Sequence, residues 1–247
     1  MIKQFLVLTF LSFLFSNNSP KIDRIIKKAN KQYNLVRDFE TTMSVNLKVP
    51  GFRMPKKSYK VYYKTPNKIK IKTKGFGVLP KTGLFTSPKD NFDNLKNLNL
   101  VLENNDSNCV LISGNVIPDS LKAQFPNEYA KLSFNPFVDV IVDTSRWLIQ
   151  SVTTRIDTVK LFEIKNLFQK FDKKYYMPIE SKIEYYIKDA KLANWLNNDF
   201  NGMMKMGNKL DAPNDVVQGT IKILYDNYKI NSGIPDRVFN DRPELND

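Results

Sequence analysis

The sequence predicts a mainly β protein of the α+β class: a strongly curved antiparallel sheet or β-barrel with helices that lid an apolar cavity. Two observations lead to this class. Many segments alternate apolar and polar residues with a period of two, as half-buried strands do, and apolar clusters fall in the connections between them. No segment repeats and no polar linker divides the 247 residues, so we expect one domain over residues 19–247.

The first residues have the pattern of a secretory signal. Lys3 is the charged start, and the apolar run Phe5–Phe15 has the length of a signal-peptide core but is short for a bilayer span. We therefore expect residues 1–18 to be a signal peptide and the protein to be secreted. The alternative is an uncleaved segment that tethers the protein to the membrane.

A helix should follow from Ser19, because a hydroxyl cap before Pro20 is a favourable helix start. Its apolar stripe consists of Ile22, Ile25, Ile26, Ala29 and Tyr33, and its basic residues are Lys21, Arg24, Lys27, Lys28 and Lys31. We expect the stripe to pack on the sheet with the charges in solvent. Contact with an anionic membrane surface is the alternative for the same charges.

The clearest hairpin lies within Lys56–Lys74, where apolar residues alternate with lysines on both sides of a turn at Thr65-Pro66-Asn67. Other strands are expected at Thr42–Val49, Leu98–Glu103, Asn108–Ser113, Phe137–Asp143, Trp147–Asp157, Val159–Phe171, Ile179–Ile187 and Val216–Tyr228.

Two apolar clusters in connections predict a pocket for an apolar ligand, because exposed loops have little reason to carry such residues. One cluster lies in the loop after the hairpin, and the other lies in a helix expected within Asp189–Leu210. With the inward strand positions, the candidate cavity and lid residues are Met43, Val45, Leu47, Tyr59, Val61, Tyr63, Phe76, Leu79, Leu84, Phe85, Trp195, Phe200, Met203 and Met204.

The composition excludes several kinds of chemistry. The chain has no histidine and one cysteine, Cys109, which rules out histidine-dependent nucleophile systems, histidine-ligated zinc and an internal disulfide. No glycine-rich phosphate loop is present. We therefore expect no enzyme, cofactor or metal, although a hydrolase with two carboxylates brought together in space stays open. The net charge of +13 favours anionic partners, and secretion argues against nucleic acid.

The order of elements resembles the LolA-like family of periplasmic lipoprotein carriers, which includes LolB-like relatives. The features that carry the resemblance are the signal, the basic helix, the strand Thr42–Val49, the hairpin residues from Tyr59 to Asn67, Val138–Val142 before Trp147-Leu148-Ile149, and the closing run from Gly219 to Tyr228. The resemblance implies an incomplete barrel around an apolar cavity that shields acyl chains in transit. It also implies lipoprotein or lipid cargo and transfer proteins in the inner and outer membranes.

One position departs from the family pattern. Carriers of this family often have arginine just before the hairpin proline, where it is implicated in moving the lid, and this chain has Thr65. Thr65 leaves open whether lid gating follows the family and whether lipoprotein itself is the cargo. The alternative on the same scaffold is a non-enzymatic envelope sensor or interaction module. In either case we expect a monomer.

Overall fold

The structure, a computed structural model, describes residues 19–49, 52–53, 55–73, 86–104, 108–117, 136–187 and 217–240. Its strands are β1 (Asp38–Val49), β2 (Phe52–Arg53), β3 (Lys57–Lys64), β4 (Lys68–Lys72), β5 (Leu95–Asn104), β6 (Cys109–Val116), β7 (Phe137–Asp143), β8 (Leu148–Ile156), β9 (Val159–Phe171), β10 (Tyr175–Ile187) and β11 (Val217–Ile230). The helices are α1 (Ser19–Tyr33), α2 (Pro88–Asp93) and α5 (Arg237–Asn240).

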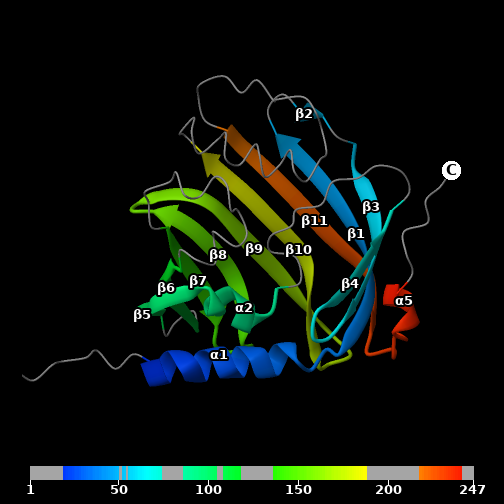
Figure 1. The fold of residues 1–247 in the computed structure, drawn as a ribbon, viewed down its shortest axis with the longest axis horizontal. Coiled ribbons are helices and arrows are strands. Elements are labelled where there is room, and N and C mark those ends of the chain that lie inside the picture. Colours follow the sequence, from blue (N-terminus) through cyan, green and yellow to red (C-terminus); the bar gives the residue numbers. More distant parts are fainter. Residues whose placement is uncertain are drawn as a thin grey trace, which may run out of the picture.

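All the strands belong to one antiparallel sheet. Its order is β4-β3-β1-β11-β10-β9-β8-β7-β6-β5, with β2 paired to β1 off this path. The sheet curves strongly and is not closed, because β4 and β5 remain as its two edges (Figure 1). The predicted fold class, a mainly β protein with an incomplete and curved antiparallel barrel, is confirmed.

The inner face of the β1, β3, β9, β10 and β11 part of the sheet is a continuous apolar core. Strand alternation produces it, since every second residue points to the same face. Its buried members are Val36, Phe39, Met43, Val45, Leu47, Tyr59, Val61, Tyr63, Leu161, Ile164, Met177, Ile183, Tyr185, Ile221, Ile223 and Tyr225.

Helix α1 runs across one end of the sheet, with α2 beside it (Figure 1). Ile22 and Ile25 of α1 are buried with Phe92 of α2 and with residues of the same face of β6, β7 and β8. The Asn30 side chain accepts a 2.9 Å hydrogen bond from the Lys89 backbone, which joins the two helices. The predicted packing of the apolar stripe on the sheet is therefore confirmed, and no helix among the described residues has the length and apolar character to cross a membrane.

Three strands begin earlier than the sequence pattern predicts, and one of them is β5, which starts at Leu95 rather than Leu98. β1 starts at Asp38 rather than Thr42, and its pairing with β11 shifts register between Glu40 and Thr42. β10 starts at Tyr175 rather than Ile179, with a register shift at Pro178. Both register shifts interrupt the alternation of apolar and polar residues. In addition, Pro178 has no N–H for the hydrogen-bond ladder, so the sequence pattern predicts that a strand does not continue through it.

The chain after β11 is fastened to the start of β1. The Asn231 side chain accepts from the Arg37 backbone at 2.6 Å and donates to the Leu35 carbonyl at 3.0 Å. Beyond it, Asp236 pairs with Lys64 at 2.6 Å and Lys68 at 2.9 Å, and these two lysines lower the pKa of Asp236 to about 2. The C-terminal segment thus holds the β3–β4 hairpin against the sheet.

Candidate ligand-binding cavity

A cavity of about 140 Å³ lies between the inner face of the sheet and the two helices α1 and α2. Helical and neighbouring residues form one wall, and β1, β3 and β8 to β11 form the other. The lining consists of Ala29, Gln32, Tyr33, Val36, Phe39, Tyr63, Thr86, Pro88, Asn91, Trp147, Leu148, Ile149, Val152, Ile164, Asn166, Phe168, Tyr176, Met177, Pro178, Ser181 and Tyr225.

No Asp, Glu, Lys or Arg is among these lining residues, and most of them are apolar. A charged ligand group would lose its hydration there without gaining an ionic partner, which is costly. Among the described residues, no group of three or more Cys, Asp or Glu side chains is placed to hold a metal ion. The cavity therefore suits a neutral, mostly apolar ligand.

Two tyrosines join α1 to the hairpin at the side of the cavity. The Tyr33 hydroxyl donates a 2.8 Å hydrogen bond to the Tyr63 hydroxyl, and Tyr63 donates to the Pro66 carbonyl at 3.3 Å. Burial is the main cause that raises the pKa of both phenols, so both are protonated at ordinary pH. The two rings meet edge to face with centroids 6.4 Å apart, and this contact fixes the C-terminal end of α1.

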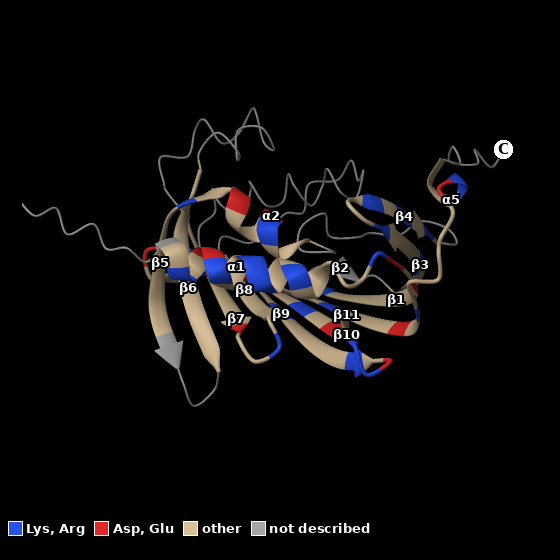
Figure 2. Ribbon diagram, turned by 90° about the horizontal axis from the view of Figure 1, so that it is seen from below, with Lys and Arg blue, Asp and Glu red and all other residues tan. Residues whose placement is uncertain are grey.

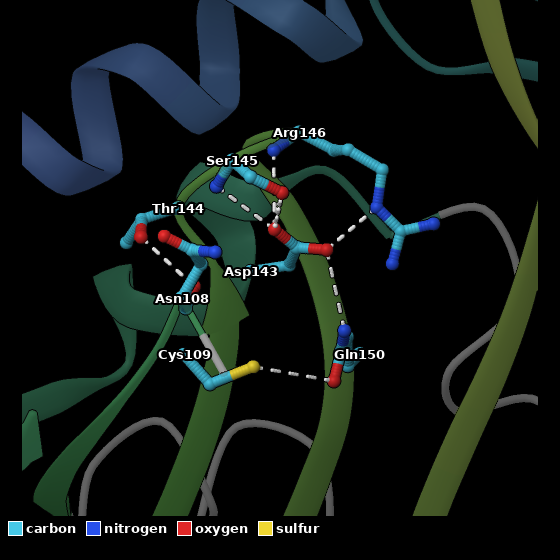
Figure 3. Close-up of polar contacts among 7 residues, drawn as sticks. All are labelled: Asn108, Cys109, Asp143, Thr144, Ser145, Arg146 and Gln150. Atoms are coloured by element: carbon cyan, nitrogen blue, oxygen red, sulfur yellow. Dashed lines mark hydrogen bonds and ion pairs between the residues drawn. The ribbon is translucent and has the colours of Figure 1, made fainter. Parts of the chain in front are cut away.

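The turn between β7 and β8 positions Trp147 in the lining, and Figure 3 shows the polar contacts that Asp143 makes in this turn. Asp143 accepts from the Ser145 backbone at 2.8 Å, the Ser145 hydroxyl at 2.6 Å and the Arg146 Nε at 2.6 Å. Trp147 then takes a left-handed backbone with φ 58°, which is uncommon for a bulky residue. Lys28 of α1 lies 4.2 Å from the centroid of its ring, so the turn and the helix hold the indole together.

The same network determines the charge state of Asp143, which is almost fully buried. Burial alone would raise its pKa. The hydrogen bonds from the side chains and backbones of Ser145 and Arg146 outweigh burial and hold the pKa below the usual range for aspartate. The turn is thus built around a buried carboxylate that stays ionised at neutral pH.

A short row of polar side chains crosses the sheet side of the cavity, one from each of three neighbouring strands. Ser181 of β10 donates to Asn166 Oδ1 of β9 at 2.6 Å, and Tyr225 of β11 donates to Ser181 Oγ at 3.3 Å. Ser181 and Tyr225 are buried, and Asn166 is half-buried. Burial raises the pKa of Tyr225 to about 12, so the phenol keeps its proton.

The dimensions limit what the cavity holds in this conformation. An engineered apolar cavity of about 150 Å³ accommodates benzene, and the cavity of this chain is nearly the same size at about 140 Å³. Ligand pockets for larger molecules are typically about 300–1,000 Å³. A long acyl chain therefore requires the cavity to widen, and the joint between α1 and β3 is one boundary that can move.

The candidate residues from the sequence fall into three groups. Tyr63 lines the cavity. Met43, Val45, Leu47, Tyr59 and Val61 are buried in the core on the same face of the sheet but are not in its lining. Phe76, Leu79, Leu84, Phe85, Trp195, Phe200, Met203 and Met204 lie outside the described residues.

Sequence reasoning did not identify most of the lining. Helix α2 was not expected, although Ser87, Pro88 and Asp90 carry its signal: the structure has a capping box in which Ser87 and Asp90 each accept the other's backbone N–H. The inward positions of β8 and β9, such as Val152 and Ile164, follow from alternation. No local signal distinguishes a residue that lines a cavity from one that packs in a core.

The outer surface of α1 is strongly basic (Figure 2). All five residues of its basic face are exposed: Lys21, Arg24, Lys27, Lys28 and Lys31. At 3.6 residues per turn they fall within ~120° of the helix surface. The hairpin lysines differ, because Lys60 pairs with Glu40 and both Lys64 and Lys68 pair with Asp236. Within the described residues, Arg24, Lys27 and Lys31 take part in no ion pair.

The sequence matches no protein-family model and no curated protein. The solved structures that are similar to the chain include the following three. LolA superfamily protein NE2245 from Nitrosomonas europaea has 10% identity and a TM-score of 0.45 over 89% of this chain and 97% of its own. An outer membrane lipoprotein-sorting protein domain from Vibrio parahaemolyticus has 9% identity and a TM-score of 0.42 over 89% and 95%. A DUF1329 family protein from Desulfovibrio piger has 11% identity and a TM-score of 0.44 over 88% and 96%.

Proposed function

We propose that the chain is a periplasmic carrier that shields acyl chains of lipoproteins or lipids during transfer toward the outer membrane. The cavity carries this proposal, because its described lining is uncharged and mostly apolar. Each CH₂ group taken out of water contributes about 0.8 kcal/mol, so such a lining favours an acyl chain over any polar cargo. The resemblance of the sequence pattern to LolA-like carriers supports the same function.

The proposed carrier is not an enzyme. A hydrolase acting on envelope polymers would need carboxylates facing its substrate as acid and base. The buried carboxylates of the described chain are used elsewhere: Asp143 holds the β7–β8 turn, Asp38 accepts from the Gly233 backbone, and Glu163 pairs with Lys160 and Lys165. None of them lines the cavity.

We further propose that residues 1–18 are removed as a signal peptide, that residues 19–247 act as one lipid-binding domain, and that the mature protein is a monomer. Transfer proteins in the inner and outer membranes would be its partners. The basic face of α1 would bring the cavity to an anionic membrane surface, because Ala29, Gln32 and Tyr33 of the same helix line the cavity. Loading and release would both require movement of this helix.

Native mass spectrometry of protein purified from the periplasm tests the proposal. The expected result is a monomer that lacks residues 1–18 and carries near-stoichiometric acylated species. Val152→Trp should reduce this occupancy at least tenfold, because Val152 lines the cavity and is only half-buried, so the indole has room to fill the space. The matched control is Ile141→Trp. Ile141 is also half-buried, but it lies on β7, on the face of the sheet opposite to the cavity.

A protein that carries no lipid and takes up no fluorescent acyl ester would contradict the carrier. Such a result, or a retained N-terminal segment, would favour the envelope sensor or interaction module. Equal loss of lipid in both tryptophan variants would show that the effect comes from general destabilisation rather than from the cavity.

A further inference from the structure

The polar row of Asn166, Ser181 and Tyr225 is unusual for its place, because it lies in the wall of a cavity that is otherwise mostly apolar. Its hydrogen bonds run in one direction. The Tyr225 hydroxyl donates to Ser181, and the Ser181 hydroxyl donates to Asn166 Oδ1. The row therefore ends at the Asn166 amide, whose oxygen accepts the Ser181 hydroxyl.

The amide nitrogen at the end of the row has hydrogen-bonding capacity left. Asn166 Nδ2 carries two N–H donors, and neither makes a hydrogen bond to any described residue. Asn166 Nδ2 is not among the fully buried atoms that lack a partner, so the nitrogen is accessible, and an acceptor on a bound ligand would pair with it. The pKa of Tyr225 is raised to about 12 by burial, so the phenol keeps the proton that it donates to Ser181 across the ordinary pH range.

We propose that Asn166 binds the carbonyl oxygen of a neutral acyl ester or amide, with Ser181 and Tyr225 as positioning residues that orient its amide. The inference rests on the proposed function, since it assigns the acyl group whose chain the cavity shields. A neutral carbonyl fits because it accepts hydrogen bonds and carries no charge. An ionised fatty acid fits poorly, because no lysine or arginine is among the lining residues.

The carrier would thus distinguish esterified or amide-linked acyl chains from free fatty acids. The apolar lining provides affinity for any acyl chain, and the row selects the chemical form of its head. A neutral ester or amide would gain one hydrogen bond in the cavity, whereas an ionised fatty acid would bring one unpaired charge into it.

The test compares three probes on the full mature protein by displacement of a fluorescent acyl ester: methyl laurate, dodecane and laurate at pH 8. Methyl laurate should bind about tenfold more tightly than dodecane, and laurate more weakly than methyl laurate. In the infrared spectrum, the ester carbonyl stretch of bound methyl laurate should lie at lower frequency than in hexane, as it does for a hydrogen-bonded ester.

Asn166→Leu keeps the size of the side chain and removes the donors. It should lower the affinity for methyl laurate to that for dodecane, leave dodecane binding unchanged or tighter, and return the carbonyl stretch to its position in hexane. Gln169→Leu, an exposed site on the same strand, is the matched control and should change none of these. Ser181→Ala should weaken ester binding less than Asn166→Leu does.

The outcomes separate the two proposals. Equal binding of ester and dodecane, with a carbonyl stretch like that in hexane, would overturn the role of Asn166 while the carrier function stands. A protein that binds none of the three probes would overturn both. Tighter binding of laurate than of methyl laurate would overturn the preference for a neutral head.

Discussion

Asp143 accepts hydrogen bonds from several donors in and beside the β7–β8 turn and thereby stabilises it (Figure 3). In Asp143→Asn, the side chain keeps one carbonyl oxygen for the backbone donors but replaces the other oxygen with an amide that faces the donors of Arg146 and Gln150. We expect the free energy of unfolding at pH 7, measured by urea denaturation, to fall by about 1–3 kcal/mol.

The effect of this variant should depend on pH in one direction. The pKa of Asp143 in the folded protein lies below its value in the unfolded chain, about 3.9. Its stabilising contribution is therefore present above about pH 4 and is lost as the pH falls further, so the difference between wild type and variant should shrink there. Asp157→Asn, in the exposed β8–β9 turn, is the control. A pH-independent difference would show that the carboxylate charge contributes nothing.

At the scale of elements, the sequence predicts strands well where the period of two is unbroken. Phe137–Asp143 and Val159–Phe171 match β7 and β9 residue for residue. The predictions miss the early starts of β1 and β10, where register shifts interrupt the alternation. They miss α2 as well, because a helix of 6 residues is too short to show an apolar period, and only its capping residues carry a signal.

The cavity is harder to predict than the strands for a physical reason. Val61 and Tyr63 share a strand and a face, yet Val61 packs in the core and Tyr63 lines the cavity. Their difference arises from where α1 and α2 lie over the sheet. Contacts between elements distant in sequence decide that position, and strand alternation carries no information about them.

The joint between α1 and β3 provides a prediction at the element scale. Tyr33→Phe removes the 2.8 Å hydrogen bond to Tyr63 and leaves the aromatic contact. The free energy that holds the helix end on the hairpin should fall by about 1 kcal/mol, so uptake of a fluorescent acyl ester should become about fivefold faster in stopped-flow experiments.

Tyr62→Phe is the matched control for this prediction, because Tyr62 lies on the same strand but faces away from the core. It should leave the uptake rate unchanged. If Tyr33→Phe lowers the stability but does not change the uptake rate, the ligand reaches the cavity by another route and the helix end is not the part that moves.

At the scale of the whole molecule, the net charge is +13, and the basic residues are paired with acidic ones more fully on the sheet than on α1. On the sheet, many basic residues are compensated: Lys222 pairs with Glu180, Lys182 with Glu184 and Arg155 with Asp139. Helix α1 crosses the end of the sheet (Figure 2), and Arg24, Lys27 and Lys31 on its basic face have no such compensation from any described residue. Uncompensated charge on the helix that borders the cavity is the arrangement that membrane docking requires.

Neutralising that face should therefore release the protein from membranes. Each basic residue near an anionic surface contributes about 1 kcal/mol, so Arg24→Gln, Lys27→Gln and Lys31→Gln together should weaken binding to vesicles of phosphatidylglycerol and phosphatidylcholine about a hundredfold. Co-sedimentation at fixed ionic strength measures this, because salt screens the attraction.

The matched control, Lys170→Gln, Lys173→Gln and Lys174→Gln, makes the same change in net charge at the β9–β10 turn. Since attraction to a surface falls off within a Debye length, only the α1 set should have a large effect. Equal losses in the two triple variants would mean that overall charge, rather than the face beside the cavity, binds the membrane.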